Sequence, residues 1–252
     1  MHVPVAAIVV ALAIAGCGGD GAQPNVSQRT ATPLDIETTG AIRGEVTFTG
    51  TPPPMRELPV KSFPGCAPSG SDPVLSGDTL VANGRVQNAF VYIKGGLGAR
   101  VFAVPATPVE IDQQGCIYVP RVVGAQVGQP ILYKNSDAVL HNVHGTPTQA
   151  TSWNMSLANK GMSRSIQLDQ AEVMIPVRCD VHPWMQSYIG IVDHPYFAVT
   201  GPDGRFELKQ VPPGEYTVGV WHEKFGTREA SATVTAQGTA TLAFNLSAAP
   251  PN

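Results

Sequence analysis

One short stretch of the chain carries three side chains that could bind a metal ion together. Cys179, His182 and Met185 are separated by two residues each, so a thiolate, an imidazole and a thioether can converge from a single loop. A second imidazole must come from another part of the chain, and His141 is well placed by the pattern around it. Two imidazoles, one thiolate and a weak axial thioether are the ligands of copper in blue electron-transfer sites.

The spacing of this motif is more specific than its residue types. The 252 residues include 4 cysteines, 6 histidines and 6 methionines, so a Cys-x2-His-x2-Met run arises by chance only about 0.002 times. Zinc is the main competing metal, but zinc favours closed sets of cysteine and histidine. A binuclear copper centre would need a second cysteine in this loop, which holds one. The alternative without a metal, in which Cys179 and Met185 are ordinary core residues, stays open.

The other histidines are expected to have supporting roles. His144 follows His141 by three residues, and on a strand that spacing points to the opposite face. We therefore expect His144 behind the ligands or at the surface rather than as a fifth ligand. His194 and His222 lie beyond the motif, and packing or hydrogen bonding is the simpler role for both. Because no Ser-His-Asp, Cys-His or paired-carboxylate arrangement stands out, we do not predict an enzyme.

The elements that must position these residues are short strands. Runs such as 89–93, 130–133 and 216–221 are rich in β-branched and aromatic residues and are bounded by turn residues. Glycine and proline supply 26 and 23 residues, which favours an all-β sandwich over long helices. The formal net charge is −3, and without a basic excess we expect no binding to nucleic acid.

The first forty residues predict export. Residues 3–14 are almost wholly apolar, which is too short a run to span a bilayer but suits a signal peptide over 1–16. The run ends at Ala15-Gly16-Cys17, which resembles the lipobox of bacterial lipoproteins, although the usual basic residue before the run is missing. The resemblance implies a lipid on Cys17, a flexible linker over 17–40 and a place on the periplasmic side of a bacterial cell envelope. A plain secretory signal is the alternative.

A first family resemblance covers the end of the chain. Residues 196–246 contain Asp-Gly at 203–204 and Pro-Pro-Gly at 212–214, as tight turns require. This segment resembles the second half of the carboxypeptidase regulatory-like (transthyretin-like) β-sandwich. The Gly-x-Val and Asn-Ala-x-Val strands of its first half occur within 41–104. The resemblance implies one sandwich made of 41–104 and 196–246 with 105–195 inserted; tandem domains or one enlarged sandwich are the alternatives.

A second resemblance covers residues 110–193 and carries the metal motif. Four segments resemble in pattern the cupredoxin family of blue copper proteins: Val127–Ile131, Asn135–Asn142, Glu172–Cys179 and Ile189–Val192. The ligand loop is as short as that of amicyanin. The resemblance implies a Greek-key sandwich over 105–195 that binds one mononuclear copper ion. The ligands that it implies are His141, Cys179, His182 and Met185.

The cupredoxin resemblance also implies roles for residues beside the ligands. Asn142 would brace the cysteine loop by hydrogen bonding. His182, Pro183 and Trp184 would form an exposed apolar port where electrons pass to a redox protein partner. With Cys17 assigned to lipid and Cys179 to metal, Cys66 and Cys116 remain, and an oxidising envelope favours a disulfide between them over two buried thiols.

Together these inferences predict an envelope-tethered carrier of single electrons between redox proteins. Its contact with the membrane would be through the lipid alone. The competing interpretation is a binding or scaffold lipoprotein whose metal is structural or absent, because a fold does not determine a function.

Overall fold

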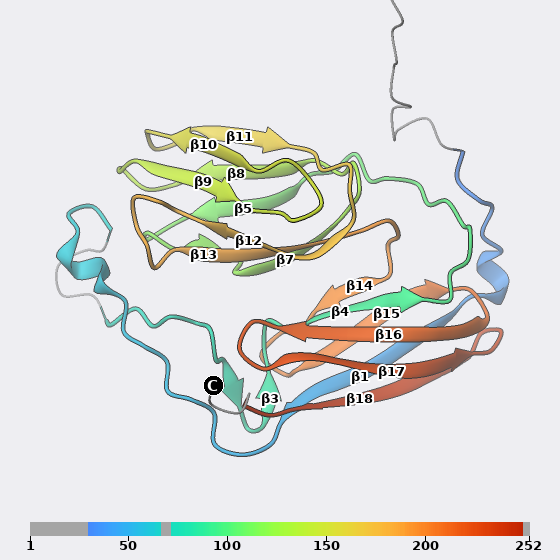
Figure 1. The fold of residues 1–252 in the computed structure, drawn as a ribbon. Coiled ribbons are helices and arrows are strands. Elements are labelled where there is room, and N and C mark those ends of the chain that lie inside the picture. The colour runs from blue at the N-terminus through green and yellow to red at the C-terminus, as the bar shows by residue number, and fades with distance from the viewer. Residues whose placement is uncertain (1–29, 67–71, 249–252) are drawn as a thin grey trace, which may run out of the picture.

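The computed structural model of the protein describes residues 30–66 and 72–248. These residues form four β-sheets, arranged as two sandwiches, with short 3-10 turns as the helical elements (Figure 1). The all-β prediction is confirmed. The predicted signal peptide, Cys17 and residues 18–29 of the predicted linker lie outside the described residues. Within the described ranges, no helix has the length and apolar character needed to cross a membrane.

The last part of the predicted linker is attached to the folded body. Asp35 caps the 3-10 helix η2 (Ile36–Thr38) with its side chain. The backbone N–H of Thr32 donates to the carbonyl of Val101 at 2.8 Å. The prediction of a flexible linker as far as residue 40 is therefore wrong for its final residues, since their polar groups find partners in the body of the protein.

One sandwich, here called the split sandwich, is built from the two ends of the described chain. Its first sheet has the order β15-β1-β3-β2 with β18 parallel to β1, and its second sheet has the order β14-β4-β16-β17. The strands are β1 (Gly40–Phe48), β2 (Val81–Ala82), β3 (Arg85–Val86), β4 (Phe90–Gly95), β14 (Phe197–Val199), β15 (Arg205–Val211), β16 (Gly214–His222), β17 (Gly226–Val234) and β18 (Thr239–Leu246).

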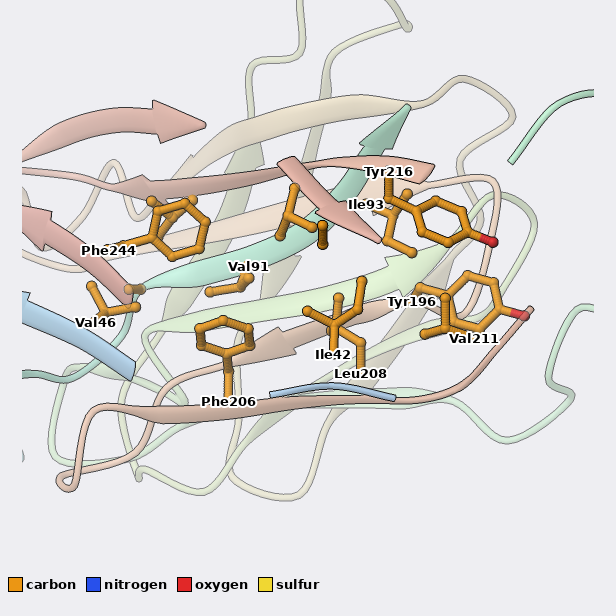
Figure 2. Packing of buried hydrophobic residues seen from close by; sticks show 14 of the residues in the cluster. Ile42, Val46, Val91, Ile93, Tyr196, Phe206, Leu208, Val211, Tyr216 and Phe244 are labelled. Carbon is orange, nitrogen blue, oxygen red and sulfur yellow. The ribbon is translucent and has the colours of Figure 1, made fainter. Parts of the chain in front are cut away.

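The core of the split sandwich joins early and late residues of the chain. Ile42 on β1 is fully buried and pairs in register with Leu208 on β15. Figure 2 shows both side chains in the same layer as Phe206, Val91 and other apolar residues. Alternate residues of each strand face this layer, because successive side chains point to opposite faces. β1 and β4 therefore share one core with β14–β18, across the long segment that lies between them.

The second sandwich, here called the inserted sandwich, lies between those two halves in sequence. Its sheets have the orders β10-β9-β12-β13-β7 and β11-β8-β5-β6. The strands are β5 (Val109–Gln113), β6 (Tyr118–Val119), β7 (Val122–Gln126), β8 (Ile131–Asn135), β9 (His141–Gly145), β10 (Trp153–Leu157), β11 (Ser163–Ile166), β12 (Glu172–Arg178) and β13 (Gln186–Val192). Tyr133, Ile175 and Ile189 are among its fully buried core residues.

One part of the chain lies elsewhere than the sequence predicted. Residues 58–66, here called the cap, include the 3-10 helix η3 (Pro59–Ser62) and were expected within the split sandwich. Leu58, Val60 and Cys66 instead pack into the core of the inserted sandwich. The cap lies at the left end of the inserted sandwich in Figure 1. The reason is a covalent and apolar attachment, because Cys66 forms a disulfide with Cys116.

The two sandwiches pack against each other through a small aromatic cluster. Phe90 of β4 is fully buried between them, together with Val122 and Val192. Two glycines make room for its ring: a Cβ on Gly124 or Gly190 would lie 2.7 or 2.5 Å from the Phe90 side chain. Close contact at these strands therefore depends on the absence of side chains.

A buried ion pair adds a polar contact to the same interface. Arg121, just before β7, holds Glu223, just after β16, with both carboxylate oxygens engaged, and the Arg121 Nη2 to Glu223 Oε2 distance is 2.8 Å. The two side chains are only 15% and 4% exposed. A bidentate arginine–carboxylate pair of this kind has a defined geometry, and here it links the start of β7 to the end of β16 across the interface.

Candidate metal centre

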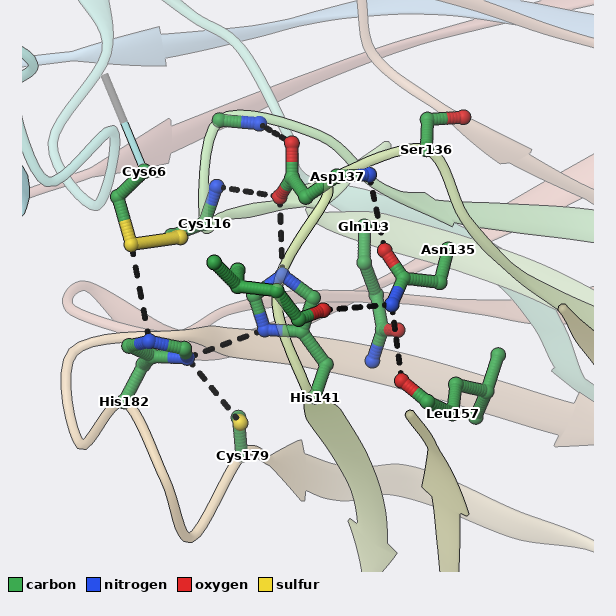
Figure 3. A network of polar contacts seen from close by, with 12 residues as sticks. Cys66, Gln113, Cys116, Asn135, Ser136, Asp137, His141, Leu157, Cys179 and His182 are labelled. Atoms are coloured by element: carbon green, nitrogen blue, oxygen red, sulfur yellow. Dashed lines mark hydrogen bonds and ion pairs between the residues drawn. A yellow bond between two sulfur atoms is a disulfide. The ribbon is translucent and has the colours of Figure 1, made fainter. Parts of the chain in front are cut away.

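Three of the predicted ligands meet at one end of the inserted sandwich. His141 opens β9, whereas Cys179 and His182 come from the loop that joins β12 to β13. The Nδ1 atoms of the two histidines are 3.0 Å apart, and Cys179 Sγ is 3.8 Å from His182 Nδ1. All three residues are buried, and their side chains point toward one another in Figure 3. The structure therefore brings together residues that are about forty positions apart in the chain.

The ligand loop is closed by its own backbone. The N–H of Cys179 donates to the carbonyl of Met185 at 3.2 Å, and the N–H of Met185 donates to the carbonyl of His182 at 2.9 Å. Met185, the predicted axial ligand, is 1% exposed and belongs to the same apolar core. Because the short loop satisfies its own polar groups, these backbone hydrogen bonds fix the positions of the cysteine and the histidine.

His141 is oriented by a carboxylate that the sequence analysis did not single out. Its outer nitrogen, Nε2, lies 2.9 Å from Asp137 Oδ2. The Asp137 carboxylate also accepts hydrogen bonds from the backbone N–H groups of Gly115 and Cys116, at 2.7 and 2.8 Å. A carboxylate behind a histidine selects the tautomer with the proton on the outer nitrogen. Nδ1 of His141 is then free to act as a ligand.

Asn142 holds the cysteine loop, as the cupredoxin resemblance implied. Its Oδ1 accepts a hydrogen bond from the backbone N–H of Asp180 at 2.6 Å, and its Nδ2 donates to the Asp180 carboxylate at 3.0 Å. Nδ2 also donates to Asn154 Oδ1 at 2.7 Å. The residue after the first histidine is therefore bonded to the residue after the cysteine.

The predicted exposed port at His182 is wrong in its exposure. His182 is 4% exposed and Trp184 is also buried, whereas Pro183 lies at the surface. The outer nitrogen of His182, Nε2, is 3.6 Å from Sγ of Cys66 in the disulfide. The ring of Phe63 meets that of His182 edge-on, with centroids 5.7 Å apart. The cap, which lies outside the segment of the cupredoxin resemblance, covers the imidazole.

Burial, hydrogen bonds and neighbouring charges shift the pKa values of the three donor residues in different directions. Burial opposes ionisation of the Cys179 thiol, but hydrogen bonds from His141 and from the backbone of the loop outweigh it and lower the pKa of Cys179. Burial likewise opposes the charged form of His141, but hydrogen bonds to Asp137 and Cys179 raise its pKa to about 9. Burial and the neighbouring charge of His141 lower the pKa of His182.

The donor set fits a copper ion. Two donors that are each about 2.0–2.3 Å from one first-row metal ion lie about 3–4 Å apart, which is the spacing measured between these nitrogens and the sulfur. Among the described residues, three groups of His, Cys and acidic side chains lie close enough together to hold a metal, and all of them share this corner of the inserted sandwich. Two of these groups include Cys66 or Cys116, whose sulfurs are joined in the disulfide. The group with a free thiol is the one that contains Cys179. Thiolate and imidazole donors without a ligating carboxylate suit copper or zinc, and a neighbouring methionine favours copper.

The remaining histidines do not join the site. His144 has its Nδ1 3.0 Å from the carboxylate of Asp180, in the supporting position that its spacing predicted. His194 Nε2 donates to the Ile93 carbonyl at 2.8 Å. His222 stacks on Phe225 with ring centroids 4.3 Å apart. These contacts are the packing and hydrogen-bonding roles that the sequence predicted.

Comparison with known proteins identifies part of this architecture. Residues 191–247 match the carboxypeptidase regulatory-like domain family. The predicted resemblance of residues 196–246 is confirmed, and the matched carboxypeptidase regulatory-like segment supplies β14–β18 of the split sandwich. No curated protein matches the sequence.

Solved structures of copper proteins are similar to part of the chain. The copper-containing nitrite reductase of Thermus scotoductus SA-01 is similar over 39% of this chain, with 20% identity and a TM-score of 0.33. This chain spans only 25% of that enzyme. A reduced amicyanin mutant is similar over 35% of this chain and 85% of its own, with 21% identity and a TM-score of 0.32. A purple cupredoxin of Nitrosopumilus maritimus is similar over 33% and 98%, with 18% identity and a TM-score of 0.29.

Sequence reasoning missed two residues that contact the histidines of the site from outside. Asp137 lies four residues before His141, and the rule that a ligating histidine gives its second N–H to a carboxylate could have identified it. No such signal identifies Phe63. It lies 119 residues before His182, in a segment with no metal-binding pattern.

Proposed function

We propose that this protein is a one-electron carrier that binds one mononuclear copper ion in the inserted sandwich. The observation that carries the proposal is the convergence of His141 Nδ1, His182 Nδ1 and Cys179 Sγ, all buried and within 4.8 Å of one another. Met185, buried in the adjoining core, would complete the set as a weak ligand. A copper ion held by these residues supplies the one-electron couple between Cu(II) and Cu(I).

The protein's part in such a reaction is to keep the site the same in both oxidation states. Asp137 holds the outer N–H of His141, and the hydrogen bonds within the ligand loop hold Cys179. Asn142 ties the two ligand segments together. Because these contacts exist among protein atoms alone, little rearrangement accompanies the gain or loss of an electron, and the buried position excludes water.

We further propose that the protein carries electrons between other proteins rather than transforming a substrate. Among the described residues, one candidate metal group keeps a free thiol, that of Cys179, and a single copper ion there would exchange one electron at a time. A redox protein partner, a lipid on Cys17 and a place on the periplasmic side of a cell envelope complete this proposal. Cys17 lies outside the described residues, so these parts rest on the sequence.

The proposal is tested by spectroscopy of the full mature chain loaded with Cu(II). We expect one copper ion per chain, an intense visible absorption band and the paramagnetic resonance signature of copper bound to thiolate. Cys179→Ala should remove the band. His144→Ala is the matched control, because His144 lies near the ligands but contacts Asp180, and it should keep the band. A wild-type protein that takes up Cu(II) without a visible band, or takes up none, contradicts the proposal.

A further inference from the structure

The outer side of His182 is enclosed by the cap. Nε2 of His182 lies on the side of the ring opposite to the two other donors, 3.6 Å from Cys66 Sγ. Phe63 lies against the same ring, as does Trp184, whose centroid is 5.3 Å away. Since only 4% of His182 is exposed, a solute in water cannot touch the imidazole.

Several contacts hold the cap in this position. Cys66 is joined to Cys116 by the disulfide, and Leu58 and Val60 are buried in the inserted core. Phe63 packs against Trp184 with centroids 4.7 Å apart, and Trp184 Nε1 donates to the Cys116 carbonyl at 2.9 Å. The cap is therefore attached to the inserted sandwich at both of its ends, and Phe63 in its middle contacts the ligand loop.

A glycine allows the cap to reach the segment before the first ligand. Gly65 has φ +89°, which side-chain-bearing residues rarely adopt. A Cβ at this position would lie 2.4 Å from Val139 Cγ1, two residues before His141. The cap thus touches both segments that deliver histidine ligands, and this contact has room for glycine alone.

We propose that the cap determines which reactants exchange electrons with the metal centre, by keeping small solutes away from His182. This inference rests on the proposed function and adds a specificity element to it. In a one-electron exchange no bond forms or breaks, and the electron passes between an external donor or acceptor and the bound copper. The disulfide takes up no electron and acts as a covalent strap. Phe63, which is 38% exposed, is the removable part of the cover.

The first test measures how fast small reagents reduce the copper-loaded protein. Wild type and Phe63→Ala are mixed with hexaammineruthenium(II) and, separately, with ferrocyanide. Because the two reagents have opposite charges, a change in rate that both show reports access to the metal centre and not an electrostatic effect. We expect the second-order rate constants for both reagents to be about tenfold higher in Phe63→Ala than in wild type. Association rate constants among variants of a single contact surface commonly differ by this much. The visible band should remain unchanged. Leu34→Ala is the matched control, because Leu34 is an apolar residue of 37% exposure in the segment before β1.

A second test needs no copper. Diethyl pyrocarbonate modifies accessible imidazoles, and peptide mapping of the metal-free protein reports the rate at each histidine. We expect His182 to be protected in wild type and to react at least about tenfold faster in Phe63→Ala, by analogy with the range for variants of one contact surface. The partly exposed His144 serves as the internal reference. A Cys66→Ser/Cys116→Ser double variant, which lacks the strap, should show the same gain.

The outcomes separate this inference from the proposed function. A visible band together with unchanged or slower reduction in Phe63→Ala overturns the inference and leaves the copper proposal standing. Rapid modification of His182 in the wild-type protein also overturns the inference. A missing band in wild type contradicts the copper proposal instead, whereas the protection of His182 in the metal-free protein can still be measured.

Discussion

Each of the two sandwiches buries a pair of histidines, and the two pairs are used in opposite ways. In and beside the split sandwich, Nδ1 of His194 accepts a hydrogen bond from the backbone N–H of Tyr196 at 3.1 Å. Nδ1 of His222 likewise accepts from the backbone N–H of Lys224 at 3.2 Å. In the inserted sandwich, the Nδ1 atoms of His141 and His182 face each other and Cys179. Burial is therefore common to both pairs, and the partners of the ring nitrogens distinguish them.

The difference also appears in charge. Burial lowers the pKa of His222 to about 4 and lowers that of His194, because desolvation outweighs the backbone hydrogen bonds and the carboxylates near each ring. His141 is also buried, but Asp137 and Cys179 supply negative charge and raise its pKa to about 9. A buried histidine whose nitrogens are bonded to backbone is a neutral packing residue. A buried histidine that faces another histidine and a thiol has capacity left for a metal.

The largest expected effect breaks this distinction directly. His141→Ala removes an inward-facing donor, so affinity for Cu(II) should fall by more than the roughly 10–100-fold that loss of an outer partner costs. His222→Gln is the matched control and should bind copper as wild type does. Competition with a chromophoric chelator measures both affinities. Equal affinity in wild type and His141→Ala would remove His141 from the site.

The next effect concerns the junction between the sandwiches. Glu223→Gln leaves the Arg121 charge without its partner at a site where both side chains are nearly buried, which should lower the free energy of unfolding by about 3 kcal/mol. The control is Glu229→Gln, because the Lys94–Glu229 pair is about half exposed on both sides and should contribute at most about 1 kcal/mol. Urea unfolding of the metal-free protein measures both. A loss no greater than that of Glu229→Gln would show that the junction does not need the pair.

A smaller effect depends on pH and sharpens the contrast between the histidine pairs. The folded-state pKa of His222 is about 4, below the unfolded value of 6.5, so between these values the unfolded chain binds a proton that the folded chain does not. Stability therefore falls as pH is lowered from 6.5 toward 4, by about 2–3 kcal/mol from this residue. Urea unfolding at pH 7 and pH 4.5 should show the loss in wild type. In His222→Gln the loss should shrink by that amount, and an unchanged pH dependence would assign the proton to another group.

The smallest effect tests how His141 is held. Asp137→Asn keeps the size of the side chain but replaces one carboxylate oxygen with an NH₂ group. The amide therefore cannot accept all three hydrogen bonds that the carboxylate accepts, from two backbone N–H groups and from the His141 ring. We expect affinity for Cu(II) to fall by about 10–100-fold, as when other outer partners are changed. Asp203→Asn is the control, since Asp203 caps an exposed turn of the split sandwich by accepting from the Arg205 backbone. Equal copper affinities in the two variants would show that Asp137 does not hold His141 in place for metal binding.

The parts of the fold that follow from local pattern could be predicted from the sequence. Strand runs such as those of β4 and β16 were visible, because alternating apolar residues between turn residues describe a half-buried strand with few alternatives. The ligand loop was visible for a similar reason, since Cys179, His182 and Met185 lie within seven residues. Their relative positions are restricted by the length of the chain alone.

Contacts between distant segments were harder to foresee. The cap was placed in the wrong sandwich because its sequence, with Leu58 and Val60 among prolines and polar residues, would suit either apolar core. Cys66 and Cys116 were paired by counting cysteines, which says nothing of what lies beside the bond. That His182 packs against this disulfide depends on three segments meeting in space.

By itself, the sequence determined which atoms could bind an ion, because residue type sets donor chemistry and short spacing limits where the donors can go. It also determined the all-β character, through strand periodicity and turn residues. Tertiary structure alone decided that the cap would lie on the inserted sandwich and that the outer edge of His182 would be closed from water. Such decisions depend on long-range packing, in which a buried surface can be covered by any segment of suitable shape.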